Sequence, residues 1–263
     1  MSEKQLFALA EAFSQLPEVE AVVLGGSRAN STQDELSDYD LYVYQSQPIS
    51  RDVRQQITER YCSYVELANQ YWEEEDDAVL HGGTVVEVIY RQLAEFTQTI
   101  DNIVTRCQAS TGYSTCFWYS LLHGRVLYEK DECFSRLQHR YDVTYPASLR
   151  QAIIDKNLPL LLNVIPAYPD QIKKAIQRGD RLSVQHRVTA YLESYFDVLF
   201  ALNGLPHPGE KRLCQYAQQH CRSLPDGFEQ HIDRLLSPAT DQELLETVRE
   251  MSEQLEALVK REM

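Results

Sequence analysis

The stretch Gly25-Gly26-Ser27-Arg28, followed by Asp38-Tyr39-Asp40, decides the fold of the first half of this chain. The apolar run 21–24 precedes the glycines, and the run 41–44 follows the second aspartate. This order predicts a strand, a tight glycine turn, a short helix, and a second strand that opens with two acids.

The residue types in this stretch suit phosphate chemistry. A glycine turn presents backbone N–H groups, and Ser27 adds a hydroxyl, to phosphate oxygens. Because strand side chains alternate between faces, Asp38 and Asp40 share a face with their Cα atoms about 6.6 Å apart. Such a pair suits Mg²⁺, which takes oxygen ligands together with substrate phosphates. Taken singly, these residues also fit an ordinary turn, a helix N-cap and solvated acids. Aspartate is depleted in strands, which favours the functional interpretation.

The segment Gly25 to Asp40 resembles the signature of the DNA polymerase beta-like nucleotidyltransferase superfamily, a Gly-Ser pair followed by Asp-x-Asp. The resemblance implies transfer of a nucleoside monophosphate from a nucleoside triphosphate, in most members ATP, to an acceptor, with release of pyrophosphate. It also implies that Asp38 and Asp40 hold one or two Mg²⁺ ions, and that Gly26, Ser27 and Arg28 contact the triphosphate.

A third carboxylate is expected on a neighbouring strand, and the candidate is Glu87 in the β-branched run 84–90. A glutamate buried there without a partner is costly, so it faces either a polar cleft or solvent. The resemblance implies that this acid ligates the metal, accepts the proton of the attacking hydroxyl, or both. Many members have aspartate here, whereas bacterial aminoglycoside adenylyltransferases use a glutamate. We interpret the denser acidic run 73–77 as a solvated loop or hairpin rim.

The composition is that of a soluble globular protein: 263 residues, 43% hydrophobic and 24% charged. No apolar run is long enough to cross a membrane, and residues 1–5 lack a signal pattern, so we expect a cytoplasmic protein without membrane contact. The six cysteines are scattered without a C-x-x-C pair, which predicts reduced thiols and no structural zinc. The net charge of −14 disfavours extended nucleic acid and is compatible with a cationic acceptor, although acidic bacterial cytosolic proteins are common.

The pattern along the chain predicts two domains: an α+β nucleotidyltransferase domain over 1–130, with a small mixed sheet, and an all-α helical bundle over 131–263. In the first domain we expect helices at 3–15, 50–61, 92–108 and 114–123, and strands at 21–24, 41–44, 71–79, 84–90 and 126–128. In the second we expect helices at 147–164, 169–178, 182–203, 209–221, 226–236 and 241–261. This layout resembles antibiotic nucleotidyltransferases and uncharacterised bacterial proteins like them.

The helical half contributes candidate residues for the acceptor. Arg187, Tyr191 and Tyr195 are four residues apart and share a helix face, and Glu193 lies on another face. An ordinary amphipathic helix has the same pattern. Lys211 follows a Pro-x-Pro-Gly turn and resembles the lysine that some relatives use to contact the triphosphate. Glu193 is the alternative to Glu87 as general base, and the sequence leaves that choice open.

We therefore predict a Mg²⁺-dependent enzyme that moves AMP, or another nucleoside monophosphate, to a hydroxyl of a small molecule, with an antibiotic as one candidate acceptor. One alternative is a protein-AMPylating regulator of the toxin–antitoxin type, and the fused bundle counts against it. Another is a non-catalytic nucleotide sensor, and the two intact acids count against that. A template-directed or tRNA-end-adding role is least favoured, because no segment is basic. The acceptor and the oligomeric state stay open, although the helical half offers surfaces for a homodimer.

Overall fold

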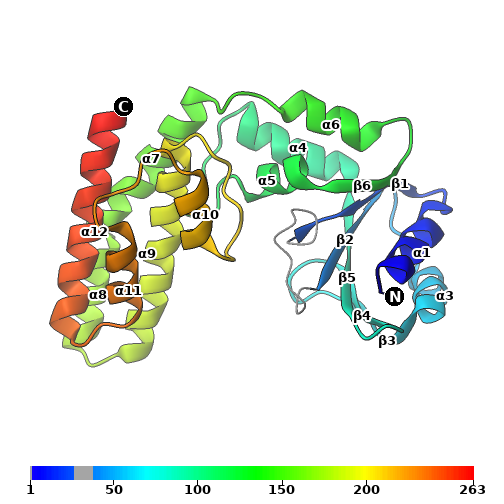
Figure 1. Cartoon of the computed structure of the whole chain (residues 1–263), viewed down its shortest axis with the longest axis horizontal. Coiled ribbons are helices and arrows are strands. Elements are labelled where there is room, and N and C mark those ends of the chain that lie inside the picture. Colours follow the sequence, from blue (N-terminus) through cyan, green and yellow to red (C-terminus); the bar gives the residue numbers. More distant parts are fainter. Residues whose placement is uncertain (1, 27–37) are drawn as a thin grey trace. The chain divides into compact units, whose positions relative to one another are not determined.

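The structure is a computed structural model that describes residues 2–26 and 38–263 (Figure 1). The chain divides into two compact units. Unit 1 consists of residues 1–101 and 120–142, and unit 2 of residues 102–119 and 143–263. The α+β fold class of the first half and the helical character of the second half are confirmed. The predicted domain boundaries, 1–130 and 131–263, stay a prediction.

Unit 1 is built on a six-stranded mixed sheet with the strand order β3-β4-β5-β2-β1-β6. The central strands β2 and β5 are parallel, and the other neighbouring pairs are antiparallel. The strands are β1 (Val19–Leu24), β2 (Tyr39–Gln45), β3 (Cys62–Asn69), β4 (Glu75–Leu80), β5 (Val85–Gln92) and β6 (Arg125–Glu129).

Two helices cover one face of this sheet: α1 (Ser2–Ser14) and α3 (Arg51–Tyr61). The buried side chains of α1 recur at helical spacing and belong to one apolar cluster with alternate residues of the central strands, such as Leu41 and Val88. Ser50 caps α3, as its position predicted, because its Oγ accepts a hydrogen bond from the Val53 N–H.

Helices α4 (Leu93–Val104) and α6 (Cys133–Tyr141) place aromatic rings on the opposite face. The ring of Tyr44, on β2, lies 5.1 Å from that of Phe96 and 4.9 Å from that of Phe134. Because side chains alternate between the faces of a strand, Asp40, four residues before Tyr44, lies on this same face of β2. The aromatic contacts therefore close the far end of the face and leave the acids toward the beginning of the strand.

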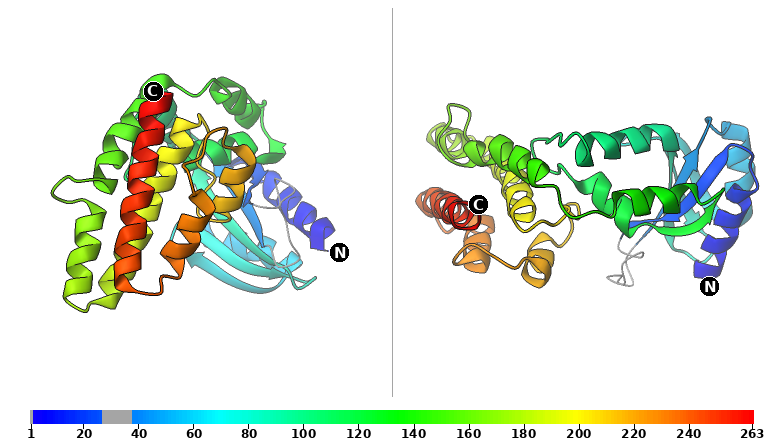
Figure 2. Two further views of the ribbon diagram at one scale, coloured as in Figure 1. Left: turned by 60° about the vertical axis from the view of Figure 1, so that its left-hand side comes forward. Right: turned by 90° about the horizontal axis from the view of Figure 1, so that it is seen from above.

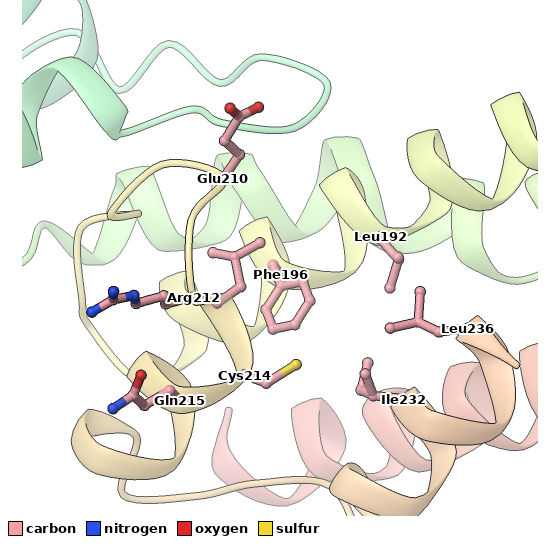
Figure 3. A pocket seen from close by; sticks show the side chains of 9 residues that line it. Leu192, Phe196, Glu210, Arg212, Cys214, Gln215, Ile232 and Leu236 are labelled. Atoms are coloured by element: carbon pink, nitrogen blue, oxygen red, sulfur yellow. The ribbon is translucent and has the colours of Figure 1, made fainter. Parts of the chain in front are cut away.

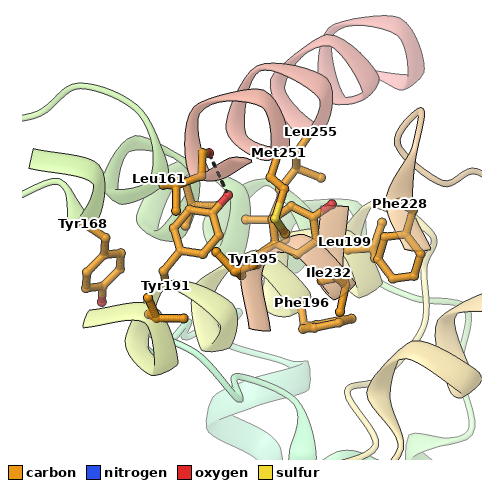
Figure 4. Packing of buried hydrophobic residues seen from close by; sticks show 14 of the residues in the cluster. Leu161, Tyr168, Tyr191, Tyr195, Phe196, Leu199, Phe228, Ile232, Met251 and Leu255 are labelled. Atoms are coloured by element: carbon orange, nitrogen blue, oxygen red, sulfur yellow. Dashed lines mark hydrogen bonds between the residues drawn. The ribbon is translucent and has the colours of Figure 1, made fainter. Parts of the chain in front are cut away.

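Unit 2 is a helical bundle with α9 at its centre, packed against α7, α8 and α12 (Figures 1 and 2). Its helices are α7 (Ala147–Leu161), α8 (Tyr168–Gln177), α9 (Arg181–Leu202), α10 (Leu213–His220), α11 (Phe228–Leu236) and α12 (Asp241–Glu262). Aromatic side chains fill much of its core, among them Tyr191, Tyr195 and Phe196 (Figure 4). The hydroxyl of Tyr191 lies 3.1 Å from the Ser252 Oγ, which satisfies a polar group inside that core.

A buried polar network ties the segment 110–114 to the bundle. The Asp197 carboxylate on α9 accepts hydrogen bonds from the N–H of Ser114 (3.0 Å), its Oγ (2.6 Å) and the Asn157 side chain (3.2 Å). Asn157 also accepts from the Gly112 N–H at 3.0 Å. The next helix, α5 (Cys116–His123), begins just after this segment and continues into unit 1.

Two elements differ from the sequence expectations. The edge strand β3 was not predicted, because its residues are half-exposed and lack a clean alternation of apolar and polar side chains. Helix α6 was also missed. It is short, and its apolar positions are Phe134, Leu137 and Tyr141.

Candidate active site

Carboxylates from neighbouring strands meet at the centre of the unit 1 sheet. Asp40 on β2 and Glu87 on β5 are directly paired in the parallel register. Neighbouring strands lie about 4.8 Å apart, so the two side chains stand next to each other on one face. Asp38, exposed and two residues before Asp40, comes just before β2 begins. The structure thus brings together the predicted acids Asp40 and Glu87.

The row of acids continues onto β4, which the sequence analysis did not anticipate. Asp77 pairs with Glu87 in the antiparallel register, and Glu75 is two residues before it on the same face. The interpretation of residues 73–77 as a solvated loop or hairpin rim was wrong for residues 75–77. Glu75, Asp76 and Asp77 are in β4, and the first two are buried. A strand was expected over 71–79, but the density of charge in that run concealed which of its acids lie on the same face as Glu87.

Asp76 points away from this row and holds the opposite face together. It accepts hydrogen bonds from the Tyr90 hydroxyl (2.7 Å) and the Ala68 N–H (2.8 Å), and it lies 3.4 Å from the Arg54 guanidinium. Alternation along β4 therefore separates a structural acid, Asp76, from Asp77, which faces Glu87.

Glu87 is half-buried among like charges. Burial raises the pKa of its carboxyl to about 7, and repulsion from Asp40, Glu75, Asp77 and Asp38 adds to that rise. A carboxyl group with such a pKa exchanges a proton readily near neutral pH, which suits a general base. The same crowding of negative charge favours a cation nearby.

The predicted glycine turn lies directly against Asp40. The Gly25 N–H donates to the Asp40 carbonyl oxygen at 2.8 Å. Gly26 has a φ of 66°, and a Cβ at this position would lie only 1.6 Å from the Asp40 Oδ2. Only glycine fits there, for both conformational and steric reasons. Ser27 and Arg28 lie outside the described residues, so their predicted phosphate contacts stay predictions.

An arginine supports the same face of the sheet farther along the strands. The guanidinium of Arg91 lies 4.4 Å from the centre of the Tyr42 ring, and Tyr42 is two residues beyond Asp40. Arg91 also donates two hydrogen bonds to Glu73, at 2.7 and 2.5 Å. Burial raises the pKa of the Tyr42 hydroxyl to about 12, so it is neutral at physiological pH.

The candidates on α9 have different surroundings within unit 2. Arg187 is exposed, whereas Tyr191 and Tyr195 are enclosed in the helical core, with 0% and 1% of their surface exposed. We therefore do not propose the two tyrosines for acceptor contacts. Glu193 is half-buried beside Gly112, and burial raises the pKa of its carboxyl. Lys211 is exposed, just before α10.

A cavity of about 410 Å³ in unit 2 lies close to two of these candidates in sequence. Figure 3 shows Leu192, Phe196, Ile232 and Leu236 surrounding it, with Glu210 and Arg212 at the edge. Its lining is mainly apolar and includes none of the residues predicted to contact nucleotide or acceptor.

Residues 8–110 match the model of the family described as a nucleotidyltransferase domain. The matched range contains the glycine turn and the acids Asp38, Asp40, Asp77 and Glu87. The recognition of this segment as part of a nucleotidyltransferase domain is thereby confirmed. A comparison with curated proteins finds no match.

Three solved structures are similar to this chain at low sequence identity. A nucleotidyltransferase-like protein from Exiguobacterium sibiricum is 15% identical, with a TM-score of 0.45, and the alignment covers 99% of this chain and 75% of that one. An aminoglycoside 6-adenyltransferase from Bacillus subtilis is 10% identical, with a TM-score of 0.33 and coverage of 100% and 91%. The CCA-adding enzyme of Thermotoga maritima, complexed with tRNA, is 11% identical, with a TM-score of 0.26 and coverage of 98% and 80%.

In the described part of the chain, no helix combines the length and apolar content that a membrane crossing requires. Within the same residues, no group of three or more histidine, cysteine, aspartate or glutamate side chains is arranged to hold a metal ion.

Proposed function

Because residues 8–110 are a nucleotidyltransferase domain, we propose that this chain transfers a nucleoside monophosphate, AMP in the first instance, from a nucleoside triphosphate to a hydroxyl of a small-molecule acceptor. The observation that carries the proposal is the in-register pair of Asp40 and Glu87, with the backbone of Gly26 held against Asp40. Gly26, which is predicted to contact phosphate, thus lies beside two carboxylates, and this supports the proposal.

The chemistry of the donor groups suits Mg²⁺. The acids offer only carboxylate oxygens, which are the ligands that this ion prefers, and burial together with repulsion among them raises the pKa of Glu87. Asp38 and Asp40 would hold the ion, with Glu87 as a further ligand or as the base. When bound, Mg²⁺ would neutralise negative charge on the triphosphate and on the departing pyrophosphate.

The reaction that we propose is an in-line displacement at the α-phosphorus. Glu87 accepts the proton of the acceptor hydroxyl, whose oxygen forms a bond to that phosphorus while the bond to pyrophosphate breaks. Backbone N–H groups of the glycine turn bind phosphate oxygens and orient the nucleotide. Lys211 as a triphosphate contact and Glu193 as the alternative base stay predictions from the sequence.

The acceptor that we propose is a small, hydroxylated and positively charged molecule. The net charge of −14 attracts cations and repels polyanions, so an extended nucleic acid is disfavoured as acceptor. Hydroxylated antibiotics with amino groups satisfy this description.

Pyrophosphate release from Mg-ATP tests the proposal, with a panel of hydroxylated antibiotics and other small molecules and with mass spectrometry of the acceptors. We expect release together with an AMP adduct on one acceptor class, and loss of both in Asp38→Asn and Asp40→Asn. Asp52→Asn is the matched control, because Asp52 is exposed on α3, which packs on the opposite face of the sheet. Normal turnover in either site variant would refute the assignment of the acids. ATP binding without release would redirect the search to protein acceptors or to a sensor role.

A further inference from the structure

The turn between β3 and β4 exposes two adjacent aromatic side chains in unit 1. Tyr71 is 80% exposed and Trp72 is 89% exposed, whereas the other tryptophan, Trp118, is 1% exposed. Aromatic side chains contribute about 150–250 Å² each when buried, so leaving two neighbours in water forgoes a large stabilisation. A paired aromatic surface of this kind is typical of a binding surface. We call residues 71–72 the aromatic turn.

The aromatic turn is anchored to the strands that carry the candidate site. The Tyr71 N–H donates to the Asn69 Oδ1 at 2.9 Å, which fixes the first half of the turn. Glu73, directly after the turn, accepts two hydrogen bonds from Arg91 on β5. Arg91 is four residues beyond Glu87, or about 13 Å along the strand. A molecule of two or three rings is long enough to cover the stretch of β5 from Glu87 to Arg91, and Arg91 binds Glu73 directly after the turn.

The surroundings of the turn are acidic. Residues 66–77 contain no lysine or arginine, and their carboxylates are Glu66, Glu73, Glu74, Glu75, Asp76 and Asp77. Arg54 pairs with Glu74 and Asp76, and Arg91 pairs with Glu73, so the nearby arginines are engaged by part of this set. A triphosphate would be repelled by the rest, whereas an amine would be attracted. The negative charge around the turn therefore favours a cationic acceptor over the nucleotide as its ligand.

We propose that Tyr71 and Trp72 bind the acceptor, and that they select a cationic, hydroxylated small molecule by stacking and cation–π contact. The β4 carboxylates on the same face as Glu87, which are Glu75 and Asp77, then receive its ammonium groups. This inference rests on the proposed function and adds the residues that determine acceptor choice. Aromatic faces attract cations through their quadrupole, most strongly in tryptophan, and the contact strengthens when water is excluded.

Tryptophan fluorescence tests binding without requiring turnover. The chain has two tryptophans, and only Trp72 is accessible to a quencher such as acrylamide. Kanamycin and streptomycin serve as cationic probes, with trehalose and Mg-ATP for comparison. We expect the cationic probes to protect the fluorescence from acrylamide, less so at high salt, and Trp72→Phe to abolish the effect. Absence of protection by both cationic probes, or equal protection by trehalose or Mg-ATP, would overturn the inference. So would protection that grows with protein concentration alone, which would indicate a second copy of the chain as the occupant.

Kinetics give the second measurement. Trp72→Ala and Tyr71→Ala are expected to raise the KM of the acceptor about tenfold, the scale of a partly desolvated cation–π contact, with little change in kcat or in the KM of ATP. Tyr64→Ala is the matched control, because Tyr64 is 58% exposed on β3 and pairs with Val79, toward the other end of the hairpin. An unchanged acceptor KM in an active Trp72→Ala enzyme would refute acceptor binding by the aromatic turn, and the proposed function would still stand. An inactive wild-type enzyme whose Trp72 is nonetheless protected would refute the function alone.

Discussion

Two glycines of unit 1 have left-handed backbones but different surroundings. Gly26 has a φ of 66° and touches the Asp40 carboxylate, whereas Gly83, in the turn between β4 and β5, has a φ of 87° and nothing within 4 Å of an added Cβ. Gly26→Ala therefore adds a clash to the backbone strain. We expect it to lose activity and about 1–3 kcal/mol of stability, while Gly83→Ala loses about 1 kcal/mol and stays active. Chemical denaturation and pyrophosphate release measure both. Equal behaviour of the two variants would show that the contact with Asp40 is unimportant.

The ionised form of Glu87 is expected to lower the stability of the fold, although the proposed reaction needs it as a base. Its pKa is raised from 4.5 to about 7, so the folded state binds this proton more tightly than the unfolded state does, and stability falls as the pH rises through that window. Because Glu87→Gln cannot ionise, it should be more stable than the wild type by about 1 kcal/mol near pH 8, after allowance for solvent screening, with little difference near pH 5. Thermal unfolding across this range measures the effect.

Mg²⁺ provides the control for that comparison. The ion should stabilise the wild type more than Glu87→Gln, because Glu87 is a proposed ligand of the ion. Activity should be lost in the variant at every pH. A difference in melting temperature that does not depend on pH would contradict the assigned surroundings of Glu87.

At the scale of an element, side chains of β4 alternate between the two faces of the sheet, so its adjacent acids have different roles. Asp76 faces Arg54 and Tyr90 in the interior, and Asp77 faces Glu87. Asp76→Asn should lower the free energy of unfolding by about 2–3 kcal/mol, because it removes a buried carboxylate that accepts hydrogen bonds and pairs with Arg54. Asp77→Asn should change stability by about 0.5 kcal/mol or less and should shift the pH profile of turnover to lower pH, since repulsion on Glu87 decreases. Urea denaturation and a pH–rate profile distinguish the two. A large stability loss in Asp77→Asn would mean that the faces are not separated in this way.

How much of each element could be predicted depended on its local pattern. Helix α1 has apolar residues at helical spacing and α3 has the N-cap Ser50, and both helices agree with their predicted ranges to within a few residues. The edge strand β3 has no such pattern. Asp40 and Glu87 were found through their apolar strands and the family resemblance, but their pairing depends on a register between strands far apart in sequence, which no local pattern encodes. Asp77 was missed because it stands in a run of acids, where charge density outweighed alternation.

At the scale of the whole molecule, the chain passes between the two units three times, at residues 101–102, 119–120 and 142–143. Each unit is therefore built from two stretches of the chain that are separated in sequence. In unit 1 the shorter segment contains α6, whose Phe134 is fully buried against Tyr44 and Phe96. In unit 2 the shorter segment contains Ser114, which is held by Asp197.

A fragment that ends at residue 130, where the sequence pattern changes, tests how far the units depend on these segments. It lacks Phe134, and loss of a buried phenylalanine side chain alone costs about 3–5 kcal/mol, comparable with the total stability of many domains. It also leaves Ser114 without the Asp197 carboxylate that accepts its hydrogen bonds. We expect residues 1–130 to show no cooperative thermal transition, whereas the full chain does. Phe134→Ala in the full chain is the matched variant and should lower the melting temperature without abolishing the transition. A fragment 1–130 that unfolds as cooperatively as the full chain would establish the boundary at 130 and would mean that α6 contributes little to the sheet it covers.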